Sequence, residues 1–169
     1  MTIFLIGFMG AGKTTFGKKL AAKLNLAFTD LDEAVLQFTK SPSLKTLIEE
    51  KEIRFFREAE TKTLKQLALE DRIISTGGGT PCYFDNMAWM KSKGVVVFLN
   101  LEEGVLFSRL KNTDLEERPL LQDLDEEGLR NFIHAKLEER MPFYSQAHLT
   151  FNPVNQKMDE LLTLLNRFG

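Results

Sequence analysis

The stretch Gly7-Phe8-Met9-Gly10-Ala11-Gly12-Lys13-Thr14-Thr15 matches the phosphate-loop pattern, in which Gly, four further residues and Gly-Lys are followed by Ser or Thr. Residues 3–6 form a short apolar run that is typical of a strand buried on both faces, and residues 18–24 have the apolar spacing of a helix. Glycines let backbone N–H groups approach an anion closely, and the positive end of the following helix dipole faces the same place. The stretch therefore predicts a nucleotide-binding site between a strand and a helix.

Two side chains of this loop carry predicted roles. We expect Lys13 to bind the β- and γ-phosphates and the Thr14 hydroxyl to ligate Mg²⁺. The alternative is a glycine-rich turn in an ordinary α/β protein, which the strand before the loop and the helix after it disfavour.

The composition sets limits on the class of protein. A length of 169 residues suggests one domain that can bury a core without disulfides. The net charge of −2 argues against a general nucleic-acid surface, which needs clustered Lys and Arg. The sequence holds one cysteine, Cys82, so it can form no internal disulfide, which fits a reducing compartment. No apolar run reaches membrane-spanning length, and we expect a cytoplasmic protein with no membrane partner.

The order of apolar runs predicts the fold class. Alternating strand-like and helix-like patterns indicate an α/β protein with a parallel sheet covered by helices on both faces, which makes three layers. In such sheets the ligand lies outside the carboxyl ends of the strands. The predicted strands cover residues 3–6, 27–29, 73–76, 95–99 and, with a weaker pattern, 149–151.

Two carboxylates end the second predicted strand. Because side chains alternate along a strand, we expect Asp30 and Asp32 to point the same way at the ligand edge of the sheet. Beside a phosphate site they would repel the nucleotide, unless one joins a Mg²⁺ shell and the other acts as a general base. The alternative is that one of them caps a helix over residues 33–38.

The predicted helix over residues 53–69 places a carboxylate, Glu60, on its apolar stripe. A buried carboxylate needs a partner, and Arg57 lies three residues earlier on the same face. The pair is either purely structural or holds a guanidinium group ready for an anionic ligand. The apolar positions of the stripe are Ile53, Phe56, Leu64 and Leu67.

Three consecutive glycines, Gly77, Gly78 and Gly79, follow the third predicted strand. Two would suffice for a turn, so three indicate a backbone surface that a ligand or another segment approaches closely. A flexible connector is the alternative.

Residues 112–128 are polar and acidic and contain Arg118-Pro119-Leu120-Leu121. A long connection of this kind is usually a mobile lid or binding loop, although some are only linkers. The next helix carries Leu129, Ile133 and Leu137, and Arg140 continues the same stripe. Arg140 thus stands where a core residue is expected, unless its side chain extends outward to solvent.

Taken together, these stretches resemble the shikimate kinases, a family within the nucleoside-monophosphate-kinase-like group of phosphate-loop proteins. The resemblance covers almost the whole chain, and the motifs occur in the family's order. They are the loop from Gly7 to Thr15, Asp30-Leu31-Asp32, Phe56-Arg57 with Glu60, the three glycines, Arg118-Pro119-Leu120-Leu121, and Arg140 with Pro142 and Tyr144.

The resemblance implies a central five-stranded parallel sheet of the phosphate-loop kinase type. It also implies a single kinase domain over residues 1–169, with a substrate subdomain at about residues 32–60 and a lid at about 112–124. The implied activity is transfer of the γ-phosphoryl group of ATP to the 3-hydroxyl of shikimate, with Mg²⁺ as cofactor and no nucleic-acid partner. We expect the protein to be a monomer.

The resemblance also assigns roles to individual residues. Asp32 contacts the substrate hydroxyls as the candidate base, and Asp30 lies in the outer shell of the metal held by Thr14. Lys13, Asp32 and Arg118 are the expected catalytic residues. The substrate carboxylate is expected between Arg57 and Arg140, with Gly78 and Gly79 offering backbone groups. The expected nucleotide-binding residues are Gly10, Ala11, Gly12, Lys13, Thr14, Thr15, Arg109 against adenine, and Arg118.

One segment departs from the family pattern. The family usually places a basic residue and a later proline beside adenine, whereas Asn152-Pro153-Val154-Asn155-Gln156 has its proline early. Among other enzymes, kinases of nucleotides need several arginines around the lid, and this segment has one. Gluconate kinase remains the second enzymatic interpretation. A nucleotide-binding module that regulates a partner is the non-enzymatic one, and the presence of Lys13, Thr14 and Asp32 disfavours it.

Overall fold

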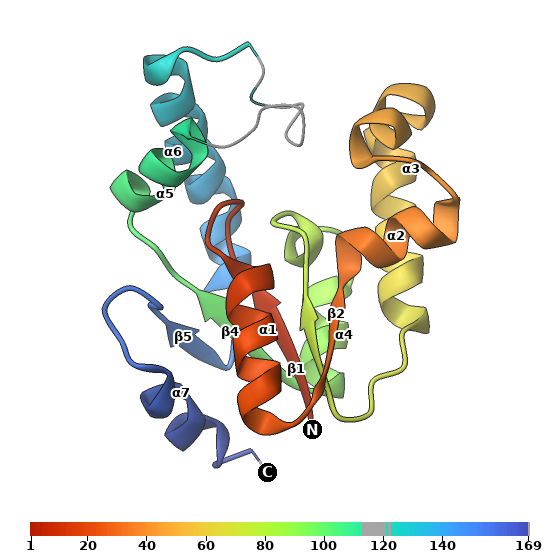
Figure 1. Ribbon diagram of the computed structural model, residues 1–169. Helices are drawn as coiled ribbons and strands as arrows, with labels where there is room; N and C mark the ends of the chain where they lie inside the picture. The colour runs from red at the N-terminus through yellow and green to blue at the C-terminus, as the bar shows by residue number, and fades with distance from the viewer. Residues whose placement is uncertain (113–120, 122, 169) are drawn as a thin grey trace.

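The computed structural model describes residues 1–112, 121 and 123–168. It contains a sheet of five strands in the order β2-β3-β1-β4-β5, and all the pairs are parallel (Figure 1). The predicted α/β class and five-stranded parallel sheet are confirmed. The strands are β1 (Thr2–Ile6), β2 (Ala27–Asp30), β3 (Arg72–Ser75), β4 (Val95–Leu99) and β5 (Leu149–Phe151).

Helices cover both faces of this sheet, with α1 and α7 in front of it and α4 behind it in Figure 1. Helices α2 and α3 pack on each other beside β2, and α5 packs on α6 at the opposite side. The helices are α1 (Lys13–Leu24), α2 (Leu31–Thr39), α3 (Leu44–Gln66), the short 3₁₀ helix η1 (Thr80–Cys82), α4 (Asn86–Lys93), α5 (Glu103–Lys111), α6 (Glu126–Tyr144) and α7 (Met158–Leu165).

The burial of the central strand β1 on both faces accounts for its apolar sequence. It lies between β3 and β4, and helices cover both its faces, so its apolar run has no polar face. Every residue of β1 is buried, and Ile3, Phe4, Leu5 and Ile6 are 0% exposed. The phosphate loop therefore begins at the end of the most deeply buried strand of the sheet.

Helix α1 approaches the sheet closely because Gly17 has no side chain. A Cβ atom at Gly17 would lie 2.6 Å from Cε2 of Phe28 and 3.0 Å from Cδ1 of Leu5. Gly17 thus lets α1 lie directly against β1 and β2, which places the start of α1 at the edge where the strands end.

Helix α3 differs from the sequence expectation. It begins at Leu44 instead of residue 53, and it contains a kink at Glu52, where φ is 69° and ψ is 155°. Phe56 and Leu64 are buried as expected, but Ile53 is 44% exposed, so its predicted burial is wrong. The kink turns the helix just before Ile53, and Ile53 borders a cavity instead of the core.

The proposed subdivision into a substrate subdomain at residues 32–60 and a lid at 112–124 remains a prediction. Helix α2 and most of α3 fall within the first of these segments. Residues 113–120 and 122 of the second lie outside the described residues. Across the helices that the structure describes, none has the length and apolar character that crossing a membrane requires.

Candidate active site

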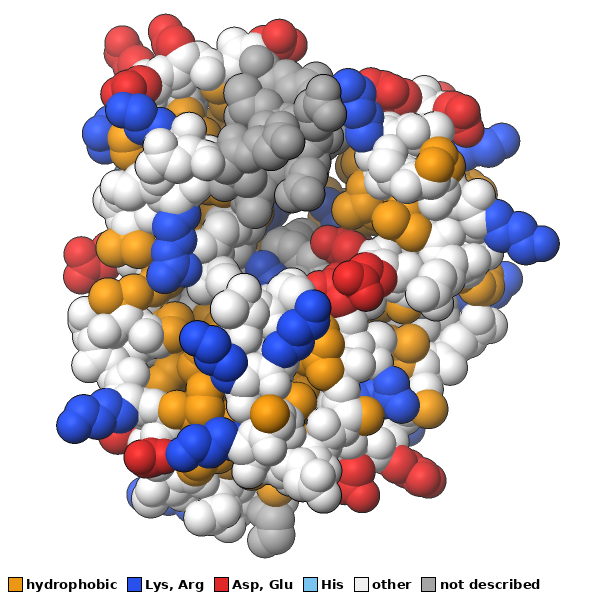
Figure 2. All heavy atoms as spheres, viewed as in Figure 1, with side chains coloured by type: hydrophobic (Ala, Val, Ile, Leu, Met, Phe, Trp, Pro, Cys, Tyr) orange, Lys and Arg blue, Asp and Glu red, His pale blue; other side chains and the backbone are white. Residues whose placement is uncertain are grey.

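A cavity of about 600 Å³ opens at the carboxyl edge of the sheet. Figure 2 shows it as a hollow in this face of the molecule, with acidic and hydrophobic side chains along its right-hand side. The phosphate loop, the ends of β2 and β3, and helices α3, α5 and α6 all contribute to its lining. The expected site residues that line it are Gly10, Gly12, Lys13, Thr14, Thr15, Asp30, Asp32, Arg57, Gly78, Gly79, Arg109 and Arg140.

Two of the expected site residues are not among those lining residues. Ala11 is 1% exposed, and its N–H donates to the Phe8 carbonyl at 3.1 Å. Arg118 lies outside the described residues, so its expected role at the phosphates remains a prediction.

The phosphate loop has the backbone that its glycines predict. Gly10 has φ of 80° and Gly12 has φ of 85°, in the left-handed region that favours glycine. Gly12 is also the N-cap of α1, so the N-terminal end of this helix lies beside the cavity. Lys13 is buried, and its Nζ donates to the carbonyls of Gly7 at 2.9 Å and Phe8 at 3.0 Å. A positive group and a positive helix end therefore meet at one side of the cavity.

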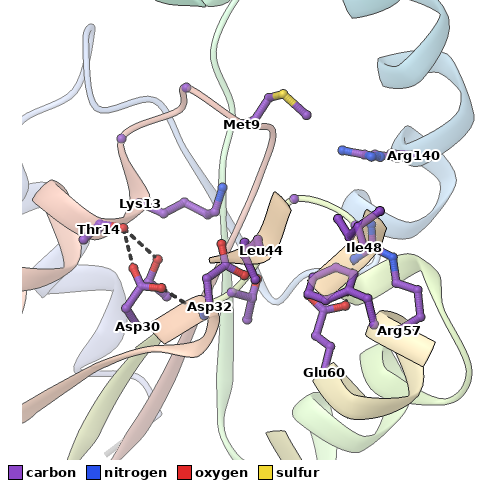
Figure 3. Close-up of a pocket in the computed structure, with 18 of the residues that line it drawn as sticks. Met9, Lys13, Thr14, Asp30, Asp32, Leu44, Ile48, Arg57, Glu60 and Arg140 are labelled. Atoms are coloured by element: carbon purple, nitrogen blue, oxygen red, sulfur yellow. Dashed lines mark hydrogen bonds and ion pairs between the residues drawn. The ribbon is translucent and has the colours of Figure 1, made fainter. Parts of the chain in front are cut away.

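Thr14 and Asp30 form the group that was expected to serve a metal ion (Figure 3). The Thr14 hydroxyl donates to Asp30 Oδ2 at 2.6 Å and lies 3.5 Å from the Ser75 hydroxyl. Within the described ranges, no group of three or more His, Cys, Asp and Glu side chains is arranged to hold a metal. The oxygen donors present here instead match the usual Mg²⁺ site, where water and substrate phosphates complete the coordination.

Asp30 also decides where β2 ends. Its Oδ1 accepts a hydrogen bond from the Asp32 N–H at 3.0 Å, which makes Asp30 the N-cap of α2. The expectation that Asp30 and Asp32 alternate along one strand is therefore wrong, because Asp32 lies in the first turn of a helix. The capping alternative holds for Asp30. Asp32 still reaches the cavity, since the helix begins at the sheet edge.

The Asp32 carboxyl group has an unusual environment. Enclosure by protein raises its pKa to about 6, and the charges of Glu60 and Asp30 add to this effect against the opposing charges of Lys13 and Arg57. Its Oδ1 atom is buried without a hydrogen-bond partner in the described part of the chain. A carboxyl group with a pKa near neutrality, beside a phosphate site, is suited to accept a proton from an acceptor hydroxyl.

Arg57 and Glu60 form the pair that their spacing predicts. Arg57 Nη1 lies 2.8 Å from Glu60 Oε2, and Glu60 is 0% exposed. Both line the cavity, and Arg57 Nε is buried without a hydrogen-bond partner among the residues described. The pair thus carries an unused donor next to a cavity, which a purely structural ion pair would not need.

Arg140 occupies a core position on α6. It is 6% exposed, so the alternative of a side chain extended to solvent is wrong. Its Nη1 atom is buried with no hydrogen-bond partner in the ranges that the structure describes. Figure 3 shows Arg140 pointing from α6 toward the side of the cavity that holds Met9, above Arg57. Two guanidinium groups from separate helices therefore face one cavity with donors unused.

The three glycines let charged side chains approach the backbone. A Cβ atom would lie 2.7 Å from Glu60 Oε1 at Gly77 and 2.5 Å from Arg57 Nη2 at Gly79. At Gly78 it would lie 3.1 Å from Arg140 Nη1. Close approach is thus the reason for this run, and the alternative of a flexible connector is wrong.

Sequence reasoning missed part of this site. The Thr80 hydroxyl donates to Glu60 Oε1 at 2.6 Å, and the Tyr83 ring centroid lies 4.5 Å from Arg57 Cζ. Leu44 and Ile48 of α3 line the cavity and give it an apolar wall. Ser43 caps α3 through the Thr46 N–H, and this Ser-x-x-Thr start was the available signal for the missed first turns. Only the tertiary contacts identify Thr80 and Tyr83.

Arg109 is the described residue at the expected adenine side. It lies on α5, and its Nη1 donates to the Gly10 carbonyl at 3.1 Å. The unusual segment after β5 forms its own turn, in which the Asn152 side chain accepts from the N–H groups of Val154 and Asn155. Contact of either segment with adenine remains a prediction.

Comparison with known proteins gives consistent results. A model of the shikimate kinase family matches residues 9–166. The shikimate kinase of Phocaeicola vulgatus is 47% identical over 161 residues, which cover 94% of this chain and 87% of that protein. The shikimate kinase of Bacteroides thetaiotaomicron is 47% identical over 152 residues, which cover 89% of this chain and 85% of that protein.

The comparison with solved structures gives the same family. A crystal structure of shikimate kinase from Bacteroides thetaiotaomicron matches with a TM-score of 0.85 at 42% identity, covering 98% of this chain and 94% of that one. The structure of shikimate kinase from Acinetobacter baumannii in complex with shikimate matches with a TM-score of 0.87 at 31% identity, covering 98% of this chain and 92% of that one. The similarity therefore extends over the sheet and every element that lines the cavity.

Proposed function

The chain belongs to the shikimate kinase family, and from this premise we propose that it transfers the γ-phosphoryl group of ATP to the 3-hydroxyl of shikimate. The product, shikimate 3-phosphate, belongs to aromatic amino-acid biosynthesis. The observation that carries the proposal is one cavity that combines a phosphate loop, a carboxyl group with a pKa of about 6, and two buried arginines with unused donors. Such a cavity suits an acceptor with hydroxyl groups and a carboxylate.

On the nucleotide side, the loop from Gly10 to Thr15, which includes Ala11, binds the phosphates through its backbone N–H groups. Lys13 leaves its carbonyl partners and binds the β- and γ-phosphates, because phosphate oxygens are charged acceptors. Thr14 holds Mg²⁺, with Asp30 in its outer shell. The ion, when bound, neutralises phosphate charge. The Thr14–Asp30 hydrogen bond at 2.6 Å supports this assignment, because it places the Asp30 carboxylate directly beside the hydroxyl oxygen that would ligate the ion. Arg109 lies against adenine.

On the acceptor side, Arg57 and Arg140 bind the shikimate carboxylate from α3 and α6. The unused donors Arg57 Nε and Arg140 Nη1 support this role, since a buried guanidinium group favours an anionic partner. Gly78 and Gly79 bring backbone groups to the substrate. The apolar wall of Leu44 and Ile48 contacts the hydrocarbon part of the ring.

The reaction forms a bond between the 3-oxygen of shikimate and the γ-phosphorus, and breaks the bond from that phosphorus to the β–γ bridging oxygen. Asp32 contacts the substrate hydroxyls and accepts the proton of the 3-hydroxyl, while ADP leaves. Lys13 and Arg118 offset the negative charge on the transferring group, although Arg118 lies outside the described residues. Positioning and charge neutralisation supply most of the catalysis in reactions of this type. The supporting observation for Asp32 is its pKa of about 6.

We also propose that the protein is a monomer in the cytoplasm. Its single cysteine fits a reducing compartment, and residues of one chain line the cavity.

The decisive experiment is an ADP-release assay with Mg·ATP and three acceptors: shikimate, gluconate and AMP. We expect turnover with shikimate alone. Turnover with gluconate alone would support the second enzymatic interpretation. Binding of ATP without turnover of any acceptor would favour a nucleotide-binding module. Mass spectrometry of the product would identify the phosphorylated acceptor.

A further inference from the structure

The guanidinium group of Arg57 is restrained from several sides. Its Nη1 atom is 2.8 Å from Glu60 Oε2, and its Cζ atom lies 4.8 Å from the Phe56 ring centroid and 4.5 Å from that of Tyr83. Gly79 flanks Nη2, where a Cβ atom would be only 2.5 Å away. The ion pair with Glu60 is the one directional contact in this set, so the position of Glu60 decides the position of Arg57.

Glu60 is in turn held by a residue that the proposed reaction does not use. Its Oε1 atom accepts the Thr80 hydroxyl at 2.6 Å, and both Glu60 and Thr80 are 0% exposed. A buried carboxylate needs partners for both oxygens. Arg57 satisfies one oxygen and Thr80 the other, so the carboxylate has one preferred orientation.

Thr80 is itself rigidly placed. It opens η1, where Pro81 follows and restricts the backbone. The Thr80 carbonyl accepts from Asn86 Nδ2 at 2.9 Å, and the same amide group donates to the Thr61 hydroxyl at 3.0 Å. Asn86 is 0% exposed at the start of α4. A series of buried hydrogen bonds thus connects α4, through Thr80 and Glu60, to Arg57.

From this geometry we propose that Thr80 is a positioning residue, which orients Arg57 for the substrate carboxylate through its hydrogen bond to Glu60. The inference rests on the proposed function, because it assumes that Arg57 binds the carboxylate. Without the hydroxyl group, the Glu60 carboxylate can rotate about its side-chain bonds, and Arg57 follows it. Thr80 is not among the cavity-lining residues, so in this proposal it acts on the substrate through Glu60 and Arg57.

The test compares Thr80→Val, which removes the donor while retaining the side-chain shape, with Thr80→Ser, which retains the donor. We expect Thr80→Val to raise KM for shikimate about tenfold, since one charge-assisted hydrogen bond is lost. KM for ATP should stay within about twofold of wild type, and Thr80→Ser should behave like wild type. Thr80→Ala, which cannot introduce a clash, carries the same expectation as Thr80→Val if the valine variant does not fold.

A double-mutant cycle separates positioning from general destabilisation. In an Arg57→Ala background, Thr80→Val should change KM for shikimate by less than about twofold, because its route of action is already absent. Equal effects in both backgrounds would overturn the inference. So would an unchanged KM in Thr80→Val, or a Thr80→Ser variant as impaired as the valine one. A wild-type protein that did not phosphorylate shikimate would instead refute the proposed function, which the wild-type assay shows separately.

Discussion

Asp32 illustrates how enclosure by protein changes the chemistry of one side chain. Its pKa is raised from 3.8 to about 6, chiefly by burial and then by Glu60 and Asp30. We predict that kcat/KM for shikimate falls as the pH decreases through about 6, because a protonated carboxyl group cannot accept a proton. Asp32→Asn should lower kcat by about 10² or more and should abolish this limb of the pH profile. A variant with unchanged kcat would make Asp32 a structural residue.

The same shift has a consequence for stability. Because the folded-state pKa is above the unfolded one, protonation of Asp32 stabilises the fold below pH 3.8, and this stabilisation is lost as the pH rises through about 6. Asp32→Asn should therefore raise the free energy of unfolding at pH 7 by roughly 2–3 kcal/mol and have little effect near pH 3. Urea denaturation at both values checks this. Asp159→Asn, at an exposed position, is the control and should change little.

Arg57 and Arg140 allow a test of carboxylate recognition. Changing either to Ala should weaken shikimate binding by about 2–4 kcal/mol, because a buried carboxylate would lose a charged partner. Lys should restore little, since it cannot reproduce a planar fork of donors. Calorimetry with shikimate measures both effects. Normal binding by both Ala variants would show that the carboxylate lies elsewhere.

At the scale of elements, Gly17 controls the approach of α1 to the sheet. We predict that Gly17→Ala lowers the free energy of unfolding by about 1–3 kcal/mol, because the added methyl group overlaps Phe28 and Leu5. Gly104, in α5, is the matched control, since among the described residues no atom beyond its chain neighbours and its own helix backbone would lie within 4 Å of an added Cβ. Gly104→Ala should be neutral or slightly stabilising through the unfolded state. Similar losses in both variants would remove packing as the explanation.

The segment at residues 112–124 carries a prediction from the sequence alone, because most of it lies outside the described residues. We expect Arg118→Ala to lower kcat far more than it weakens shikimate binding, since this arginine would neutralise charge during transfer.

Hydrogen exchange across the segment at residues 112–124 should slow when an ATP analogue and shikimate are both bound. Equal exchange with and without the two ligands would argue against a closing lid.

At the scale of the whole molecule, we expect the two ligands to share one cavity but to use different elements. Lys13 belongs to the phosphate loop and Arg57 to α3, and both line the same space. A ligand that binds only the native state stabilises the fold, and at a given concentration it does so more the more tightly it binds. Lys13→Ala should therefore abolish turnover and reduce the rise in Tm with Mg·ATP, while retaining the rise with shikimate.

Arg57→Ala is the matched variant and should show the reverse pattern of Tm shifts. Wild-type turnover by Lys13→Ala would remove the phosphate loop from the mechanism. Loss of both shifts in either variant would indicate that the change disturbs the entire cavity. Circular dichroism of the unliganded proteins checks that both variants are folded.

Much of the fold was determined by local sequence. The phosphate loop, the order of the five strands along the chain and the apolar stripe that ends at Arg140 all depend on neighbouring residues, through glycine conformation and hydrophobic periodicity. The spacing of Arg57 and Glu60 also predicted their ion pair, because residues three apart share a helix face. These features follow from interactions within a few residues.

The tertiary structure decided the features that the local sequence pattern left open or could not predict. The sequence allowed either Asp30 or Asp32 to cap the helix, and only the structure shows that Asp30 is the cap and that β2 ends before Asp32. The pKa of Asp32 depends on Glu60, 28 positions away, and the orientation of Glu60 depends on Thr80, 20 positions farther along the chain. The physical reason is that burial and charge act through space, so they exist only after distant segments have packed together.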